Sequence, residues 1–163
     1  MFKKLLFISL FSVLLPLALF GAKNANTEVE ELTKGDVIDM FNQFNVNIAE
    51  DIKNPNLVTF VYKQNSKMIN KWMKYYRFIE VDTEIDRSWY EKAAKLLTCM
   101  GECKSFMTRF IHKAEKDKSP EYQKVLANFK DAQKQFAELV KHPTPVDPKK
   151  LEKLRQEKYK AGK

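Results

Sequence analysis

Both cysteines of the chain lie in one short stretch, Leu96 to Met107, which reads LLTCMGECKSFM. Cys99 and Cys103 are four residues apart, and Gly101, one of only four glycines in the chain, lies between them. Thiols can form a disulfide, act as nucleophiles or bind soft metal ions. If a local feature of this sequence carries chemistry, it is this stretch.

Three hypotheses fit the cysteine pair. The first, which we expect, is a disulfide between Cys99 and Cys103, because an even pair in an exported chain is usually bridged. Such a bridge would favour a break in the helix near Gly101. The second is a pair of reduced thiols buried as small hydrophobes. The third is a Cu(I) site in which Met100 and Met107 join the two thiolates, because soft ligands suit that ion.

Other catalytic patterns are not evident in the sequence. It contains no glycine-rich phosphate loop, no Gly-x-Ser-x-Gly and no His-Glu-x-x-His. Of the two histidines, His112 lies in a lysine-rich stretch and is expected to be solvated, and His142 precedes a proline in a linker. We therefore predict that the protein is not an enzyme and needs no cofactor, with Cu(I) as the alternative. No motif in the chain identifies a family.

The N-terminal segment predicts export. Residues 1–22 begin with Lys3 and Lys4 and continue without a charge from Leu5 to Ala22. A basic start before an apolar run is typical of a secretory signal peptide. The run is at the lower edge of the length that spans a bilayer, about 17–25 residues. We predict a periplasmic protein, with inner-membrane anchoring as the alternative if the segment is not cleaved.

The remaining residues favour an all-α domain. Glycine and proline are scarce, whereas alanine, lysine, glutamate, leucine and phenylalanine are plentiful, as in helical proteins. The predicted organisation is a signal peptide over 1–22, a polar lead-in over 23–34, a helical domain over 35–141, and a proline-containing linker with a basic arm over 142–163. A chain of this length is expected to fold as one domain.

Apolar residues recur every three or four positions in four segments, which predicts an antiparallel bundle of four or five helices. The predicted helices run from Gly35 to Lys53, from Pro55 to about Phe78, from a cap at Thr83 onward, and from a cap at Ser119 onward. Their predicted buried faces are Val37, Phe41, Phe44, Ile48 and Ile52; Leu57, Val61, Met68, Trp72 and Tyr75; Trp89, Ala93, Leu96, Met100, Cys103, Met107 and Phe110; and Tyr122, Val125, Phe129, Ala132, Phe136 and Leu139.

Positive charge concentrates at the C-terminus. The chain has 29 basic and 21 acidic residues, and residues 141–163 hold eight of the basic and three of the acidic ones. Asp147-Pro148 is predicted to begin a short helix that runs to about Tyr159 and has little apolar face. We expect this helix to be an exposed basic arm. The alternating acids of residues 80–86 lack the glycine and glutamate of a calcium loop and are expected to favour the start of the third helix.

These features predict a non-catalytic periplasmic protein that binds other proteins, such as an accessory subunit, adaptor or chaperone of a secretion or motility machine of the envelope. The predicted contact residues are Lys74, Tyr76 and Arg77 in an aromatic-basic run, and Lys149, Lys150, Lys153, Arg155, Lys158 and Lys160 in the basic arm. An acidic protein surface or anionic membrane headgroups would suit the arm. Nucleic acid is an unexpected partner for an exported chain. The alternative function is a Cu(I) carrier that uses the cysteine pair.

Overall fold

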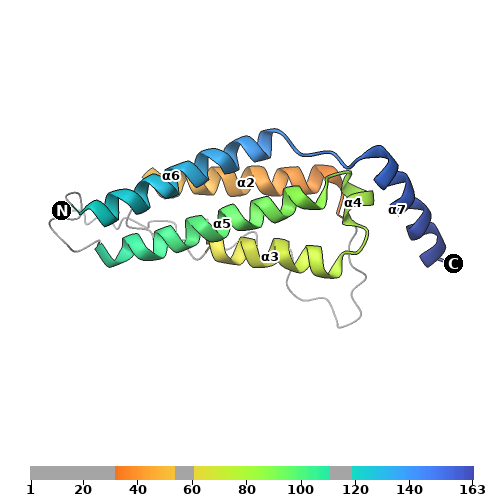
Figure 1. Cartoon of the computed structure of the whole chain (residues 1–163), viewed down its shortest axis with the longest axis horizontal. Coiled ribbons are helices and arrows are strands. Elements are labelled where there is room, and N and C mark those ends of the chain that lie inside the picture. The colour runs from red at the N-terminus through yellow and green to blue at the C-terminus, as the bar shows by residue number, and fades with distance from the viewer. Residues whose placement is uncertain (1–31, 54–60, 111–118) are drawn as a thin grey trace, which may run out of the picture. The chain divides into compact units, whose positions relative to one another are not determined.

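The computed structural model describes residues 32–53, 61–110 and 119–163, and these residues confirm the all-α class. The helices are α2 Lys34–Lys53, α3 Val61–Tyr75, α4 Ile79–Thr83, α5 Arg87–Met107, the 3-10 turn η1 Thr108–Phe110, α6 Pro120–Lys141 and α7 Pro148–Ala161 (Figure 1). None of these helices is long and apolar enough to cross a bilayer. The predicted signal peptide, Leu57, the Asn54-Pro55 start of the second helix and His112 lie outside the described residues.

Helix α5 organises the core. It packs against α3 on one side and α6 on the other, and α2 contacts α6 (Figure 1). The ring of Phe41 on α2 lies 4.4 Å from that of Trp89 on α5 and 6.0 Å from that of Phe136 on α6. The indole Nε1 of Trp89 donates a hydrogen bond of 2.9 Å to the carbonyl of Leu139. This aromatic cluster therefore joins three helices.

The predicted buried faces of α2, α5 and α6 are largely confirmed. Buried residues are Val37, Phe41, Phe44 and Ile48 on α2; Trp89, Ala93, Met100 and Cys103 on α5; and Phe129, Ala132, Phe136 and Leu139 on α6. The predicted residues Leu96, Met107, Phe110, Tyr122 and Val125 are half-buried at the edges of these faces. Spacings of three and four residues place such side chains on one side of a helix, so the pattern locates the core directly.

Helix α3 buries a face about one position from the predicted one, and the predicted residues Met68 and Trp72 are half-buried against the core. Its buried residues are Tyr62, Ser66 and Ile69, whereas Tyr75 is 67% exposed. The hydroxyl of Ser66 donates to the carbonyl of Ala94 at 3.0 Å and lies 2.7 Å from the hydroxyl of Thr98. These contacts satisfy the polar atom inside the core. A prediction from apolar residues alone could not include Ser66, and it therefore placed the buried face of α3 on the neighbouring row of side chains.

The predicted N-cap at Thr83 is also wrong. Thr83 is the last residue of the short helix α4, and its buried hydroxyl donates to the carbonyl of Ile79 at 2.6 Å and contacts the hydroxyl of Tyr90 at 2.7 Å. The cap of α5 is Asp86, whose carboxylate accepts from the backbone N–H of Ser88 at 2.9 Å. The cap moves because the chain makes an extra turn of helix before α5 begins.

Helix α5 is continuous through Gly101, so the break that a disulfide would favour is not present. A Cβ at Gly101 would lie 2.9 Å from Cγ of Lys63 and 3.2 Å from Cβ of Tyr62. Both contacts are with α3. The glycine is therefore explained by the close approach of two helices, which requires the smallest side chain at this point.

The predicted caps of the last two helices are confirmed. Ser119 Oγ accepts a hydrogen bond from the backbone N–H of Tyr122 at 3.4 Å. The Asp147 carboxylate accepts from the N–H groups of Lys149 and Lys150, each at 3.0 Å. Each cap is followed by a proline at the start of its helix. Short-range signals of this kind define where α6 and α7 begin.

Candidate functional site

The cysteine pair differs from the predicted disulfide. Cys99 is half-buried, Cys103 is 8% exposed, and both are free thiols whose sulfur atoms are not at bonding distance. In a continuous helix, residues four apart share a face but lie one turn from each other. Their side chains then run roughly in parallel, which is a poor geometry for a bridge.

The environment of Cys103 supports the hypothesis of reduced, buried thiols. Burial, followed by the neighbouring Cys99, raises the pKa of the Cys103 thiol to about 11. At neutral pH this thiol is therefore protonated, which makes it a poor nucleophile. Of the two methionines in the Cu(I) hypothesis, Met100 is fully buried in the core and Met107 is half-buried. Within the described ranges, no three His, Cys, Asp or Glu side chains form a group that could hold a metal ion.

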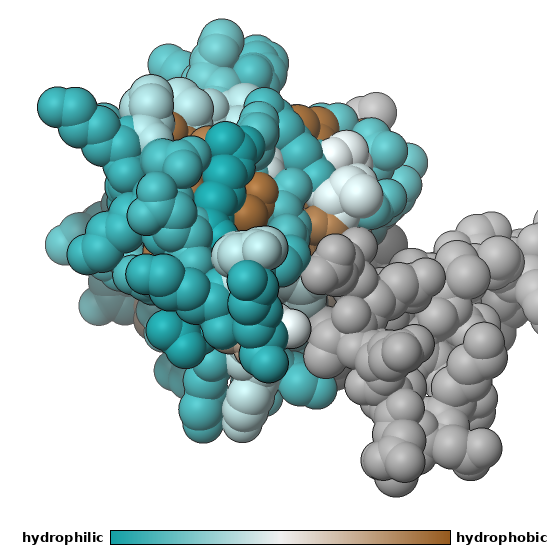
Figure 2. All heavy atoms as spheres, turned by 90° about the vertical axis from the view of Figure 1, so that its right-hand side faces the viewer, coloured by the Kyte–Doolittle hydropathy of each residue, from teal (hydrophilic) through white to brown (hydrophobic). Residues whose placement is uncertain are grey.

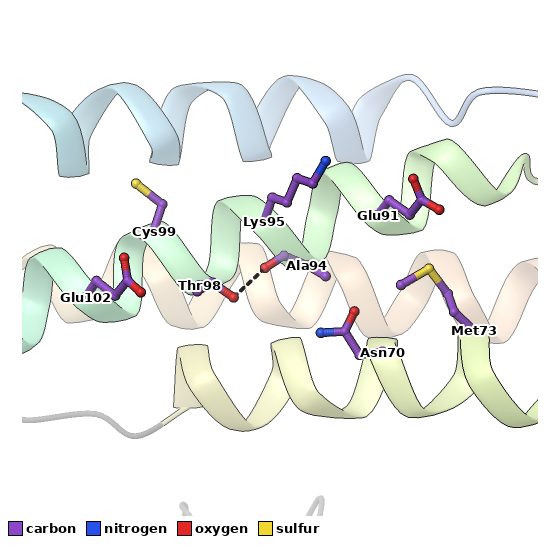
Figure 3. A pocket seen from close by; sticks show the side chains of 8 residues that line it. All are labelled: Asn70, Met73, Glu91, Ala94, Lys95, Thr98, Cys99 and Glu102. Carbon is purple, nitrogen blue, oxygen red and sulfur yellow. Dashed lines mark hydrogen bonds between the residues drawn. The ribbon is translucent and has the colours of Figure 1, made fainter.

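Cys99 also lines an open cavity of about 310 Å³ between α3 and α5 (Figure 3). The lining residues are Asn70, Met73, Glu91, Ala94, Lys95, Thr98, Cys99 and Glu102. The hydroxyl of Thr98 donates to the carbonyl of Ala94 within α5, as the dashed line shows. The charged lining residues are exposed and of both signs. This cavity therefore shows no convergent set of polar groups that would select a ligand.

The difference between the two thiols predicts unequal reactivity. At pH 8 we expect iodoacetamide to modify Cys99 well before Cys103, because the alkylated species is the thiolate and Cys103 is both buried and protonated. The rate at Cys103 should rise as the pH approaches about 11. Peptide mass spectrometry of samples taken over time measures both rates. Equal rates at pH 8 would contradict the assignment.

A buried ion pair links α2 to α5, and the sequence did not predict it. Asp51 on α2 and Lys104 on α5 have side chains only 3% and 7% exposed, and their charged atoms are 3.1 Å apart. The hydroxyl of Tyr62 on α3 donates to the same Asp51 oxygen at 2.5 Å. The predicted core residue Ile52 is instead 36% exposed, because Asp51 occupies the inward position. A single acid at helical spacing offers no signal that distinguishes it from a surface residue.

Helix α7 packs by charge against four carboxylates, which we call the acidic strip: Glu80, Asp82, Glu84 and Asp86. The ion pairs are Lys150–Glu80 at 2.7 Å, Lys150–Asp86 at 2.8 Å, Arg155–Glu84 at 3.2 Å and Lys158–Asp82 at 2.6 Å. No residue of α7 is buried, as predicted for an exposed arm. However, α7 is not an unattached arm, because half of its predicted contact residues are paired within the chain.

Two of the strip's carboxylates, Glu80 and Asp86, share the ammonium group of Lys150. Glu80 is buried and accepts from the backbone N–H of Arg87 at 3.2 Å as well as from its side chain. Lys150 is the main cause that lowers the pKa of Asp86 to about 2, and Asp86 in turn raises the pKa of Lys150. A pair that shifts both pKa values in this way favours the docked helix while both groups are charged.

The linker before α7 pairs with the backbone of the strip. The N–H of Asp86 donates to the carbonyl of Thr144 at 2.9 Å, and the N–H of Val146 donates to the carbonyl of Glu84 at 3.1 Å. Ile85 and Pro145 form an isolated antiparallel bridge between these hydrogen bonds. This pairing sets the register in which the cations of α7 meet the carboxylates of the strip.

The docking of α7 is expected to depend on pH with a defined sign. Lys150, the largest cause of the lowered pKa of Asp86, stabilises docking above the ordinary pKa of about 3.8, and this contribution is lost as the pH falls towards 2, whereas the part due to Ser88 belongs to the cap of α5. The raised pKa of Lys150 stabilises docking below about 10.5, and this contribution is lost at higher pH. Amide exchange of residues 148–161, measured as a ratio to that of α5, should therefore be nearly constant between pH 6 and pH 5 and rise between pH 4 and pH 2. A constant ratio would contradict this prediction.

The structure brings the two predicted contact segments together. Arg77, which follows α3, lies 3.9 Å from Glu157 of α7. Within the aromatic-basic run the predicted Tyr76 is half-buried, and its hydroxyl accepts from the N–H of Leu32 at 3.1 Å. Tyr75 is the exposed aromatic residue, and the Lys74 ammonium lies 5.1 Å from its ring centre. The exposed tyrosine of the run is therefore Tyr75 and not the predicted Tyr76.

The remaining cations of α7 point away from the strip. We call Lys149, Lys153, Tyr159 and Lys160 the outer face of α7. Tyr159 is 67% exposed, and the ammonium of Lys163 lies 4.4 Å from its ring centre. The three lysines are exposed and form no ion pair with another described residue. Figure 2, which views the molecule from the side of α7, shows a largely hydrophilic surface with a few hydrophobic residues.

The described histidine, His142, is exposed at the C-terminal end of α6. The end of the molecule that carries α7 combines paired charges, unpaired lysines and two exposed tyrosines. Comparisons with protein-family models, with curated proteins and with solved structures find no match to this chain.

Proposed function

We propose that this chain is a non-catalytic exported protein that works by binding other proteins, as an accessory subunit, adaptor or chaperone of an envelope complex. In this proposal residues 1–22 are a secretory signal peptide that directs the chain to the periplasm. Helices α2, α3, α5 and α6 form an antiparallel bundle that serves as the scaffold. The contact surface is the end that carries Lys74–Arg77 and the outer face of α7.

The observation that carries this proposal is the meeting of two separate segments at one surface. Arg77 and Glu157 join them, and each segment contributes a tyrosine that is 67% exposed, Tyr75 and Tyr159. Tyrosine and arginine are enriched among the residues that contribute most to protein interfaces. A large aromatic side chain beside a lysine offers a partner both apolar area and a charge.

Affinity purification from the native envelope tests the proposal. The tagged full chain is compared with the double variant Tyr75→Ala/Tyr159→Ala, and the recovered proteins are quantified by mass spectrometry. We expect at least one envelope protein to be recovered with the wild type and lost with the double variant. The matched control is Val46→Ala, which removes an exposed apolar side chain of α2. Identical recovery with the double variant, or no specific recovery with the wild type, would contradict the proposal.

A further inference from the structure

We propose that α7 binds an acidic segment of a protein partner, and that this segment replaces the acidic strip on the inner face of α7. In this scheme the strip occupies the inner face of α7 within the chain until the partner replaces it. The inference rests on the proposed function and adds the chemistry of the partner and the way in which its site is covered.

The first argument is that α7 is attached mainly by charge. No side chain of α7 is buried, and its apolar residues Leu151 and Leu154 are only half-buried. The carboxylates of the strip range from the buried Glu80 to the half-exposed Glu84, but the three cations of α7 that meet them are 33% to 49% exposed. Ion pairs with a solvated cation contribute little each, so a helix held by them can separate without loss of the core.

The second argument is that the chain already contains a segment that fits α7. The strip places carboxylates at every second residue, and three cations of α7 meet them within 3.2 Å. A partner segment with carboxylates at a similar spacing would meet the same cations. The strip therefore identifies the ligand chemistry as an acidic polypeptide segment.

The third argument is that the docked strip covers the cations that the partner would bind. While the strip is docked, Lys150, Arg155 and Lys158 are neutralised by it. Once released, these cations join the outer face of α7 and present a helix with positive charge on several sides. The bound strip thus lowers the fraction of molecules that can bind, and the apparent affinity falls by that fraction.

The test uses the chain from residue 23 to residue 163 and a fluorescent synthetic peptide that copies residues 79–87. Fluorescence anisotropy at a low ionic strength of about 50 mM measures binding, because screening weakens such contacts at higher salt. The key variant is Asp82→Asn/Glu84→Gln, which removes two carboxylates of the strip and leaves the buried Glu80 in place. We expect it to bind the peptide about three- to tenfold more tightly than the wild type does.

Two further variants test whether the gain in peptide affinity comes from the loss of the strip's carboxylates. Arg155→Gln/Lys158→Gln should bind the peptide at least about threefold more weakly, because it removes the cations that the peptide would meet. Asp131→Asn/Glu138→Gln makes the same change in net charge at exposed acids of α6 and should leave the affinity close to that of the wild type.

Several results would overturn the inference. Equal affinity for the strip variant and the α6 control would show that the strip does not compete. If the strip variant instead gained affinity only for vesicles of phosphatidylcholine and phosphatidylglycerol in equal parts, α7 would be a membrane-binding helix. Failure of the peptide experiment while the tyrosine-dependent recovery of an envelope protein persists would remove this inference and leave the proposed function intact.

Discussion

Replacing Lys104 by methionine is expected to lower the free energy of unfolding by about 3–5 kcal/mol, because it leaves the charge of Asp51 buried without its cation. The two side chains are 7% and 3% exposed and 3.1 Å apart. The second carboxylate oxygen of Asp51 is buried and has no hydrogen-bond partner among the residues that the structure describes. Only Lys104 and the Tyr62 hydroxyl are seen to offset the desolvation of this group among the described residues.

Urea unfolding followed by circular dichroism measures this change. The matched control is Lys134→Met on α6, where the lysine is exposed and a change within about 0.5 kcal/mol is expected. The double variant Lys104→Met/Asp51→Asn should recover much of the loss, because the neutral amide can still accept from Tyr62 and no buried charge remains. A loss below about 1 kcal/mol in Lys104→Met would mean that the pair is solvated in solution.

Replacing Gly101 by leucine is expected to lower the free energy of unfolding by about 2 kcal/mol. Leucine favours helix over glycine by about 1 kcal/mol, which would stabilise α5 if space were available. The space is not available, because the first side-chain atom would already lie 2.9 Å from Lys63 and 3.2 Å from Tyr62. Helices α3 and α5 would have to separate, and the cost of that movement exceeds the gain in propensity.

A short series of variants checks this explanation. Gly101→Ala should change stability less than Gly101→Leu, because the exposed Lys63 side chain can move aside for one methyl group. Lys92→Leu, at an exposed position of the same helix, should leave stability within about 0.5 kcal/mol. Urea unfolding of all three variants provides the comparison. A leucine variant as stable as the wild type would refute the close approach of α3 and α5.

The cysteine pair shows why local patterns did not decide the chemistry of this chain. The spacing and the predicted export favoured a bridge, and the same spacing lies within an unbroken helix in the structure. Gly101, which suggested a break, instead lies where α3 approaches α5 closely, and α3 is distant in sequence. The role of the glycine therefore follows from a contact that the local sequence does not show.

What the sequence determined by itself is the set of features that act within one or two turns. The buried faces of α2 and α6 follow from residue spacing, and the starts of α6 and α7 follow from Ser119 and Asp147, whose side chains cap the N–H groups next to them. The all-α class follows from composition and the same periodicity. These interactions are short in sequence, so their residue types and spacings suffice to predict them.

What only the tertiary structure decided is which distant charges and polar groups meet. Nothing in the sequence marks Asp51 and Lys104 as a buried pair. Lys150 and Glu80, which also form an ion pair, are 70 residues apart in the sequence. A charged residue can be solvated on the surface or paired with an opposite charge, so its residue type does not reveal whether it has a partner or which one. The packing of α3, α5 and α7 chooses the partners, and it thereby divides the basic helix into a docked face and an outer face.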